Sequence, residues 1–245
     1  MVHGVGEQSS SYDAGTLEAS EGFVKYYRWV IGRLGGPIRG RTLEVGAGTG
    51  AMSGRIAHLC DDMVLVEPAE NLSAMLERRF ADQPQVQVRS GSLEEAVAAD
   101  PATFEAGFDS VVSFNVLEHI PDDVGTLRTV GSLLRPTGRV VLFVPSVPFL
   151  YGAIDAQVDH QRRYTKQSMA TAITAAGLEV EHMEYLDFLG MIPWFFVGRV
   201  LRRTVEGGGV GLYDRVVIPV CRVFDRLIGP PIGKNLIAVA RHPAR

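Results

Sequence analysis

The 245-residue chain has little cysteine, no strong charge imbalance and no long apolar run. Its two cysteines, Cys60 and Cys221, each lie among apolar residues, which argues against a disulfide framework and favours reduced core residues of a cytoplasmic protein. A net charge of −4 gives no electrostatic reason for a polyanionic partner, so nucleic acid is disfavoured as a substrate. Because no segment has the roughly twenty apolar residues of a membrane span, we expect a soluble protein, at most peripheral to a membrane.

The sequence does contain a regular alternation of apolar runs and helical segments. Apolar residues at helical spacing predict a helix over 18–34, and Thr165 is the expected N-cap of another that runs to Ala176. Strand-like runs alternate with such segments, which predicts a doubly wound α/β fold with a mostly parallel sheet and helices on both faces. Ligands of such sheets bind at the carboxyl ends of the strands. The expected strands are 41–45, 63–67, 86–89, 108–114, 139–145, 178–186 and 235–241.

The first expected strand ends in closely spaced glycines, Glu-Val-Gly-Ala-Gly-Thr-Gly over residues 44–50, and the second ends on Glu67. Glycines there let the backbone approach a ligand, and a carboxylate roughly twenty residues further on can accept hydrogen bonds from two ribose hydroxyls. Dinucleotide sites carry Gly-x-Gly-x-x-Gly instead, and Glu44 would repel a phosphate at close range. The pattern favours a cationic or zwitterionic nucleoside without phosphate, such as S-adenosylmethionine.

Residues 44–50 resemble the first motif of the class I S-adenosylmethionine-dependent methyltransferases. Three later stretches resemble further motifs in the family's order: the turn at 91–93, the fourth strand and its loop at 108–119, and the turn into the fifth strand at 133–145. The resemblance implies a Rossmann-like methyltransferase fold with a seven-stranded sheet whose last strand is antiparallel. It also implies S-adenosylmethionine as the cofactor.

The resemblance further implies roles around the cofactor. Glu44 would orient the ammonium group, Glu67 would hold the ribose, and the turn at 91–93 would contact the adenine, although the family often has Asp where Ser92 stands. Aromatic residues of the first helix would cover the cofactor, and helix-to-sheet packing explains them equally well. The implied cofactor-binding residues are Tyr27, Trp29, Glu44, Gly46, Ala47, Gly48, Gly50, Glu67, Pro68, Ser92, Leu93, Asn115 and Val116.

Methyl transfer needs a general base only if the acceptor must lose a proton. His119 is one candidate because it follows the fourth strand, and its alternative role is a structural hydrogen bond to the loop backbone. The long loop at 146–164 resembles one that borders the acceptor pocket in small-molecule and quinone-pathway methyltransferases, which adds His160 and Tyr164 as candidates. Ion-pair alternatives in this loop are Arg162 or Arg163 with Asp155 or Asp159.

The sequence predicts three regions along the chain. Residues 1–17 form a polar, flexible N-terminus, and residues 18–186 with 234–245 form the cofactor-binding domain. The stretch between them, 187–233, is rich in aromatic and apolar residues and is predicted to be a helical insertion. Such a density of apolar side chains needs a surface to bury against, so the alternatives are a lid over the acceptor, a homodimer contact or a membrane-contact element.

Other functions compete with methyl transfer to a small molecule. The glycine spacing and Glu44 argue against a nicotinamide-dependent oxidoreductase. A nucleic-acid adenine methyltransferase would carry Asn/Asp-Pro-Pro-aromatic where this chain has Asn-Val-Leu-Glu at 115–118. A metal-dependent catechol-type enzyme would need clustered acids, so no metal is expected. A non-catalytic S-adenosylmethionine-binding module would lack the long loop and the insertion. We expect methyl transfer to a small or lipid-like, largely apolar acceptor, such as an isoprenoid, a quinone precursor or a secondary metabolite, with the acceptor atom left open.

Overall fold

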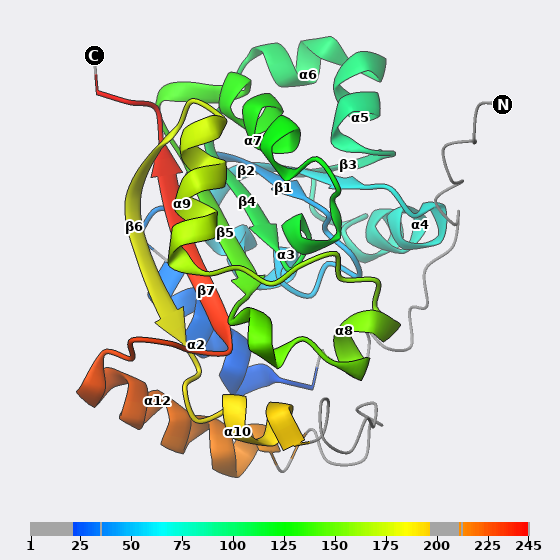
Figure 1. Ribbon diagram of the computed structural model, residues 1–245. Coiled ribbons are helices and arrows are strands. Elements are labelled where there is room, and N and C mark those ends of the chain that lie inside the picture. Colours follow the sequence, from blue (N-terminus) through cyan, green and yellow to red (C-terminus); the bar gives the residue numbers. More distant parts are fainter. Residues whose placement is uncertain (1–21, 35, 197–210, 212, 245) are drawn as a thin grey trace, which may run out of the picture.

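The computed structural model describes residues 22–34, 36–196, 211 and 213–244 (Figure 1). The described residues form one seven-stranded sheet with strand order β3-β2-β1-β4-β5-β7-β6. Neighbouring strands are parallel throughout except at β7, which is antiparallel to both of its neighbours. The strands are β1 (Gly40–Val45), β2 (Cys60–Glu67), β3 (Val86–Ser90), β4 (Phe108–Phe114), β5 (Leu134–Pro145), β6 (Glu179–Leu186) and β7 (Asn235–Arg241).

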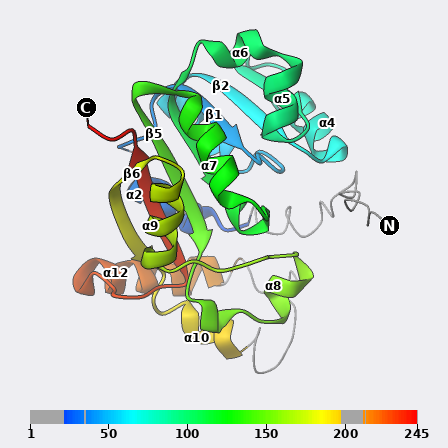
Figure 2. The same ribbon diagram turned by 45° about the horizontal axis from the view of Figure 1, so that its top comes forward.

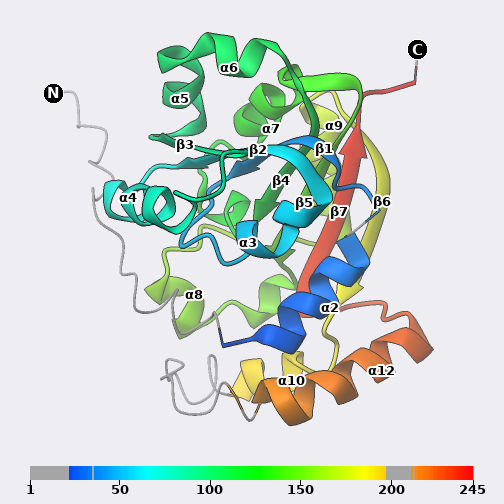
Figure 3. The same ribbon diagram turned by 180° about the vertical axis from the view of Figure 1, so that it is seen from behind.

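Helices cover both faces of the sheet, and each face has its own apolar core. One face packs against α5 (Leu93–Ala99), α6 (Pro101–Glu105), α7 (Asp123–Ser132) and α9 (Lys166–Ala175) (Figure 2). The other packs against α2 (Val24–Leu34), α3 (Ser53–Ile56), α4 (Glu70–Arg79) and α12 (Ile218–Ile228) (Figure 3). The shorter elements are η1 (Ala57–Leu59), η2 (Leu117–His119), η3 (Pro148–Leu150), α8 (Ala153–Gln157), α10 (Met191–Trp194) and η5 (Tyr213–Val217).

The architecture confirms the doubly wound, mostly parallel α/β sheet with an antiparallel last strand. Buried apolar residues run along the central strands because helices cover both sides of them. The bounds of β4 and β7 are as predicted, whereas β2 and β5 begin earlier than expected, at Cys60 and Leu134. Their first residues are partly polar and lie outside the apolar run that marked each strand in the sequence.

Thr165 caps α9 as expected, and its hydroxyl accepts a hydrogen bond from the amide of Ser168 at 3.0 Å. The helix predicted over 18–34 is α2, which begins only at Val24, because Gly22 and Phe23 are described and are not helical. The flexible stretch predicted for 1–17 lies outside the described residues. Within the predicted insertion the described residues include α10, η5 and α12. No described helix has the length and apolar character needed to span a bilayer.

Candidate active site

The loop after β1 is held in a shape that only glycine adopts easily. Gly46 and Gly48 have positive φ angles of 73° and 57°. A Cβ on Gly46 would lie 2.5 Å from Cγ2 of Val116, so the loop after β4 packs directly on the loop after β1. The amides of Gly46 and Ala47 both donate to the carbonyl of Val66, at 2.8 and 3.1 Å. The predicted glycine loop and the predicted Val116 are therefore brought together at the carboxyl ends of β1, β2 and β4.

Glu67 ties the glycine loop to the end of β2. Its Oε2 accepts a hydrogen bond from the Gly48 amide at 2.8 Å, and its Oε1 accepts one from the Ala69 amide at 3.0 Å. Burial raises the pKa of Glu67, and these two amide hydrogen bonds oppose the rise. A carboxylate offers about four lone-pair positions, so each oxygen can still accept a second donor such as a ribose hydroxyl.

Glu44 is a buried carboxyl group whose hydrogen-bonding capacity is not satisfied. The residue is 1% exposed, and its Oε2 has no hydrogen-bond partner among the described residues. Burial raises the pKa of Glu44 to about 8, and the neighbouring Glu67 carboxylate adds to the rise. A buried carboxyl oxygen without a hydrogen bond is costly, so this position fits a ligand that brings its own positive charge or hydrogen-bond donors.

The remaining predicted cofactor residues follow the carboxyl ends of β2, β3 and β4 or lie on α2. Pro68 is exposed at the end of β2, Leu93 is buried at the start of α5, and Asn115 has a φ of 53° in the loop after β4. The Tyr27 ring lies 5.0 Å from the guanidinium of Arg55 on α3, the helix that follows the glycine loop. Tyr27 is thus placed near that loop.

Trp29 and Ser92 have other contacts. Trp29 is 5% exposed and lines a groove with residues of β6, which three strands separate from β1. The Ser92 hydroxyl caps α5 by accepting a hydrogen bond from the Glu95 amide, while Glu95 Oε2 accepts one from the Ser92 amide at 2.8 Å. The Ser-x-x-Glu spacing of Ser92 and Glu95 is the sequence pattern that predicts this capping box. Trp29 belongs to the same buried apolar core as Ala47 of the glycine loop, and its role at the cofactor stays a prediction.

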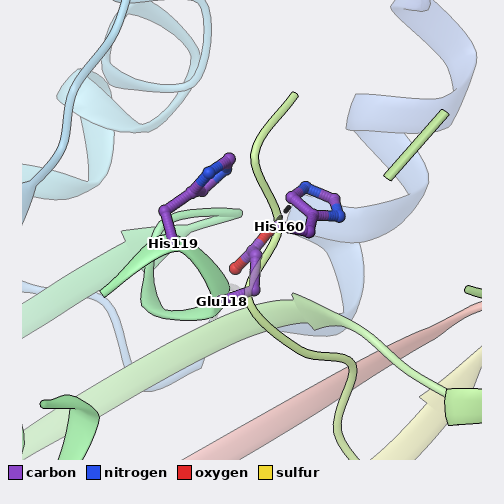
Figure 4. A group of neighbouring side chains, drawn as sticks. All are labelled: Glu118, His119 and His160. Carbon is purple, nitrogen blue, oxygen red and sulfur yellow. Dashed lines mark ion pairs between the residues drawn. The ribbon is translucent and has the colours of Figure 1, made fainter. Parts of the chain in front are cut away.

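Three side chains converge beyond the end of β4, and two of them are the predicted histidines (Figure 4). The rings of His119 and His160 lie 4.7 Å apart. His160 Nδ1 lies 2.8 Å from Oδ1 of Asp155, and its Nε2 lies 3.6 Å from Oε1 of Glu118. An imidazolium at His160 would therefore lie between two carboxyl groups.

Asp155 is fixed in place by several donors. It is fully buried, and it accepts hydrogen bonds from Arg163 Nε at 2.7 Å and from the Gly152 amide at 3.0 Å. Burial alone would raise the pKa of Asp155, but the hydrogen bonds from His160 and Arg163 lower it below its usual value. Of the ion pairs considered in this loop, Arg163 with Asp155 is present, while Arg162 pairs with Asp123 at 2.8 Å.

Glu118 is the functional candidate that the sequence analysis missed. It is fully buried, neither carboxyl oxygen has a hydrogen-bond partner among the described residues, and burial raises its pKa to about 8. Burial and the neighbouring His160 lower the pKa of His119 to about 4, so that ring is neutral at pH 7, and it hydrogen-bonds the Asp159 backbone. The ligand atoms of Glu118, His119 and His160 lie within 4.8 Å of one another, a set that could hold a divalent cation.

Tyr164 does not join the histidines. Its hydroxyl donates to Asp123 Oδ2 at 2.7 Å, and its ring is buried in the core of the α7 and α9 face. Burial and the nearby Asp123 carboxylate raise the pKa of Tyr164. The hydroxyl is therefore a protonated donor used within the fold.

Comparison with known proteins decides the family. Residues 24–183 match the family described as methyltransferase domain. The chain belongs to this family. Among the relatives of this methyltransferase, the ubiquinone biosynthesis O-methyltransferase of Xanthomonas euvesicatoria pv. vesicatoria (strain 85-10) is 27% identical over 180 residues, which is 67% of this chain and 72% of the relative. The enzyme of the same name from Aeromonas salmonicida (strain A449) is 24% identical over 187 residues, or 70% and 76% of the two chains.

Solved structures share the fold of this methyltransferase. A complex between the Haloferax volcanii Trm112 methyltransferase activator and the putative methyltransferase has a TM-score of 0.65 at 13% identity, covering 98% of this chain and all of the other. Burkholderia thailandensis 1,6-didemethyltoxoflavin-N1-methyltransferase, with bound S-adenosylhomocysteine, has a TM-score of 0.57 at 18% identity, covering 96% and 85%. The expected fold and activity class are confirmed.

The cofactor of this methyltransferase is S-adenosylmethionine. The residues present fit it. The unpartnered, buried Oε2 of Glu44 suits an ammonium group, and the Glu67 carboxylate at the end of β2 has lone pairs left for hydroxyl donors. A phosphate does not suit the Glu67 position, because it would lie beside that carboxylate.

Proposed function

We propose that this methyltransferase transfers a methyl group to a hydroxyl oxygen of a small, largely apolar acceptor, and that His160 accepts the hydroxyl proton. The observation that supports this proposal is the position of His160 between the buried carboxyl groups of Asp155 and Glu118. The O-methyltransferase relatives act in ubiquinone biosynthesis, as their name says, which favours a phenol-like acceptor such as a quinone precursor.

On this proposal the cofactor is held at the glycine loop. Glu44 orients its ammonium group, Glu67 accepts hydrogen bonds from its ribose, and the backbone of residues 46–48 lies against its methionine portion. Pro68 and Leu93 border the adenine, and Asn115 and Val116 line the methionine side. When bound, S-adenosylmethionine supplies an electrophilic methyl group on a sulfonium leaving group, so the protein mainly has to align the acceptor and exclude water.

The acceptor site lies along η2 and the loop at 146–164. His119 follows Val116 by only three residues, and Val116 packs on Gly46, so the histidines lie close to the glycine loop. Asp155 holds His160 Nδ1, which leaves Nε2 to take the acceptor proton. Asp155 would stabilise the imidazolium that forms, since its carboxylate lies 2.8 Å from Nδ1.

The direct test uses labelled S-adenosylmethionine and a panel of acceptors. Phenols and catechols with apolar tails should give methyl ethers, identified by mass spectrometry, whereas amines of the same shape should not react. Products methylated at nitrogen or carbon would contradict the proposal.

The role of His160 is tested by the variant His160→Gln. We expect turnover at saturating cofactor to fall by roughly 10²–10⁴-fold, the usual contribution of a general base, with unchanged affinity for S-adenosylhomocysteine. His182→Gln is the matched control, because that side chain is 57% exposed on β6. A chelator should leave wild-type turnover unchanged; its loss on chelation, with recovery on adding a divalent metal, would assign the cluster to a cation instead.

A further inference from the structure

Two buried aspartates, one in η5 and one in α12, hydrogen-bond to backbone amides of the domain. Asp214, just before α12 in η5, accepts hydrogen bonds from the amides of Lys25 at 2.8 Å and Tyr26 at 2.9 Å. Asp225 accepts them from the amides of Asp187 at 2.6 Å and Phe188 at 3.2 Å. Both acids are buried, as are Ile218 and Cys221 on the same side. The inward face of η5 and α12 therefore contains all of their carboxyl groups.

The outward face is apolar and exposed. Val216, Val220, Val223 and Leu227 recur at intervals of four, three and four residues, which places them on one side of the helix. They are 54%, 58%, 58% and 78% exposed. No described residue covers this stripe, and four large apolar side chains in a row exceed the scattered exposure that is normal for a monomer.

Arginines flank the stripe. The side chains of Arg215, Arg222 and Arg226 are exposed, and none of the three forms an ion pair with a described residue. Arg222 and Arg226 also line a groove of about 330 Å³ between α12, α2 and β6, together with Arg28 and Arg33. Arg33 pairs with Glu184, and the Asp225 carboxylate in the groove is occupied by backbone amides. The groove therefore carries an excess of positive charge.

The stripe lies at the end of the molecule toward which the parallel strands point. Figures 1 and 3 show α10 and α12 beyond the carboxyl ends of β5 and β6. Phe188, in the segment between β6 and α10, stacks on Phe224 of α12 with ring centroids 5.7 Å apart. Ile192 on α10 and Phe196 just after it are 55% and 53% exposed at the same end.

We propose that this surface, formed by the exposed stripe of α12 with Ile192 and Phe196, docks on a bilayer of anionic phospholipid. The apolar side chains enter the boundary between head groups and acyl chains, and the arginines contact phosphate groups, as expected for an amphipathic helix lying in the plane of the interface. A second copy of the chain would offer the same positive charges, whereas an anionic bilayer complements them. The docked orientation also brings an apolar acceptor from the bilayer to the active site, a consequence that rests on the proposed function.

The test is co-sedimentation of the full chain with vesicles. We expect binding to vesicles of phosphatidylcholine with phosphatidylglycerol, weaker binding to phosphatidylcholine alone, and release at high salt. Arg222→Ala and Arg226→Ala should each weaken binding about fivefold, the effect of removing one positive charge near an anionic surface, while Arg222→Lys should retain it. Leu227→Asp should weaken binding about tenfold or more. Arg78→Ala, which removes an exposed arginine of α4, is the control and should have no effect.

Two outcomes would overturn docking. One is the absence of binding to phosphatidylglycerol vesicles by the wild-type chain. The other is a wild-type chain that does not bind vesicles and is a dimer by light scattering, where Leu227→Asp converts the dimer to a monomer. Leu227→Asp should keep its affinity for S-adenosylhomocysteine, which shows that it is folded. Failure of methyl ether formation would leave vesicle binding unchanged, so the two proposals are tested separately.

Discussion

Glu44 is a buried acid that is mostly protonated in the cofactor-free protein at pH 7, since its pKa is about 8. A bound ammonium group favours the carboxylate, so binding should release close to one proton near pH 7. Calorimetry with S-adenosylhomocysteine in buffers of different ionisation enthalpy measures this release. In Glu44→Gln the release should vanish and the affinity should fall about tenfold or more. Equal proton release in the variant would remove Glu44 from the ammonium site.

Glu67 holds the glycine loop through the Gly48 amide and is also the proposed acceptor for the ribose hydroxyls. Glu67→Ala should weaken S-adenosylhomocysteine binding by roughly 2 to 4 kcal/mol, because it removes the charged acceptor of the ribose hydroxyl hydrogen bonds and leaves the Gly48 amide without its acceptor. Titration calorimetry measures the loss. Glu77→Ala, an exposed position on α4, is the matched control. An unchanged affinity in Glu67→Ala would exclude the ribose role.

At the scale of elements, end caps and loop contacts set where the site residues lie. The capping box of Ser92 and Glu95 fixes the start of α5, and the buried pair of Asp155 with Arg163 fixes the loop that carries His160. Loss of either contact should shift the site residues, without removing a group that touches the reactants.

The Ser92 hydroxyl is the N-cap of α5. Ser92→Ala should lower the free energy of unfolding by about 1 kcal/mol, the usual cost of losing an N-cap hydroxyl, and denaturant unfolding measures it. Ser92→Asp keeps an N-cap acceptor and restores the residue common in the resembling family, so it should retain stability. If Ser92→Ala instead weakened cofactor binding without a loss of stability, the hydroxyl would have a ligand role.

At the scale of the whole molecule, two buried carboxyl groups make the stability of the cofactor-free protein depend on pH. Glu44 and Glu118 both have a pKa of about 8 in the fold, against an ordinary value near 4.5. Below about pH 4.5 these two carboxyl groups are protonated in the folded and in the unfolded protein. As the pH rises toward 8 the unfolded chain loses these protons first, which favours unfolding.

Stability should therefore fall by several kcal/mol between about pH 5.5 and pH 8, since one pKa unit corresponds to about 1.4 kcal/mol. Urea unfolding at the two pH values measures the change. The double variant Glu44→Gln with Glu118→Gln should lose most of this dependence over that range. A wild-type protein equally stable at both values would show that these groups are not buried as acids.

Features that depend on local pattern were predictable from the amino-acid sequence. Apolar runs marked β4 and β7 to the residue, and the glycines with Glu67 identified the cofactor edge, because strand periodicity and backbone freedom at glycine are properties of neighbouring residues. The N-cap at Thr165 was predictable for the same reason.

The contacts between polar groups became known only from the folded chain. Glu118 was unremarkable in the sequence, and becomes a buried, unpartnered carboxyl group because the loop at 146–164 folds over it. Asp214 and Asp225 would pass for solvated charges in the sequence, yet both turn inward onto backbone amides and leave the outer face of α12 apolar and basic. Burial and pairing depend on contacts between distant segments, and local pattern carries no information about them.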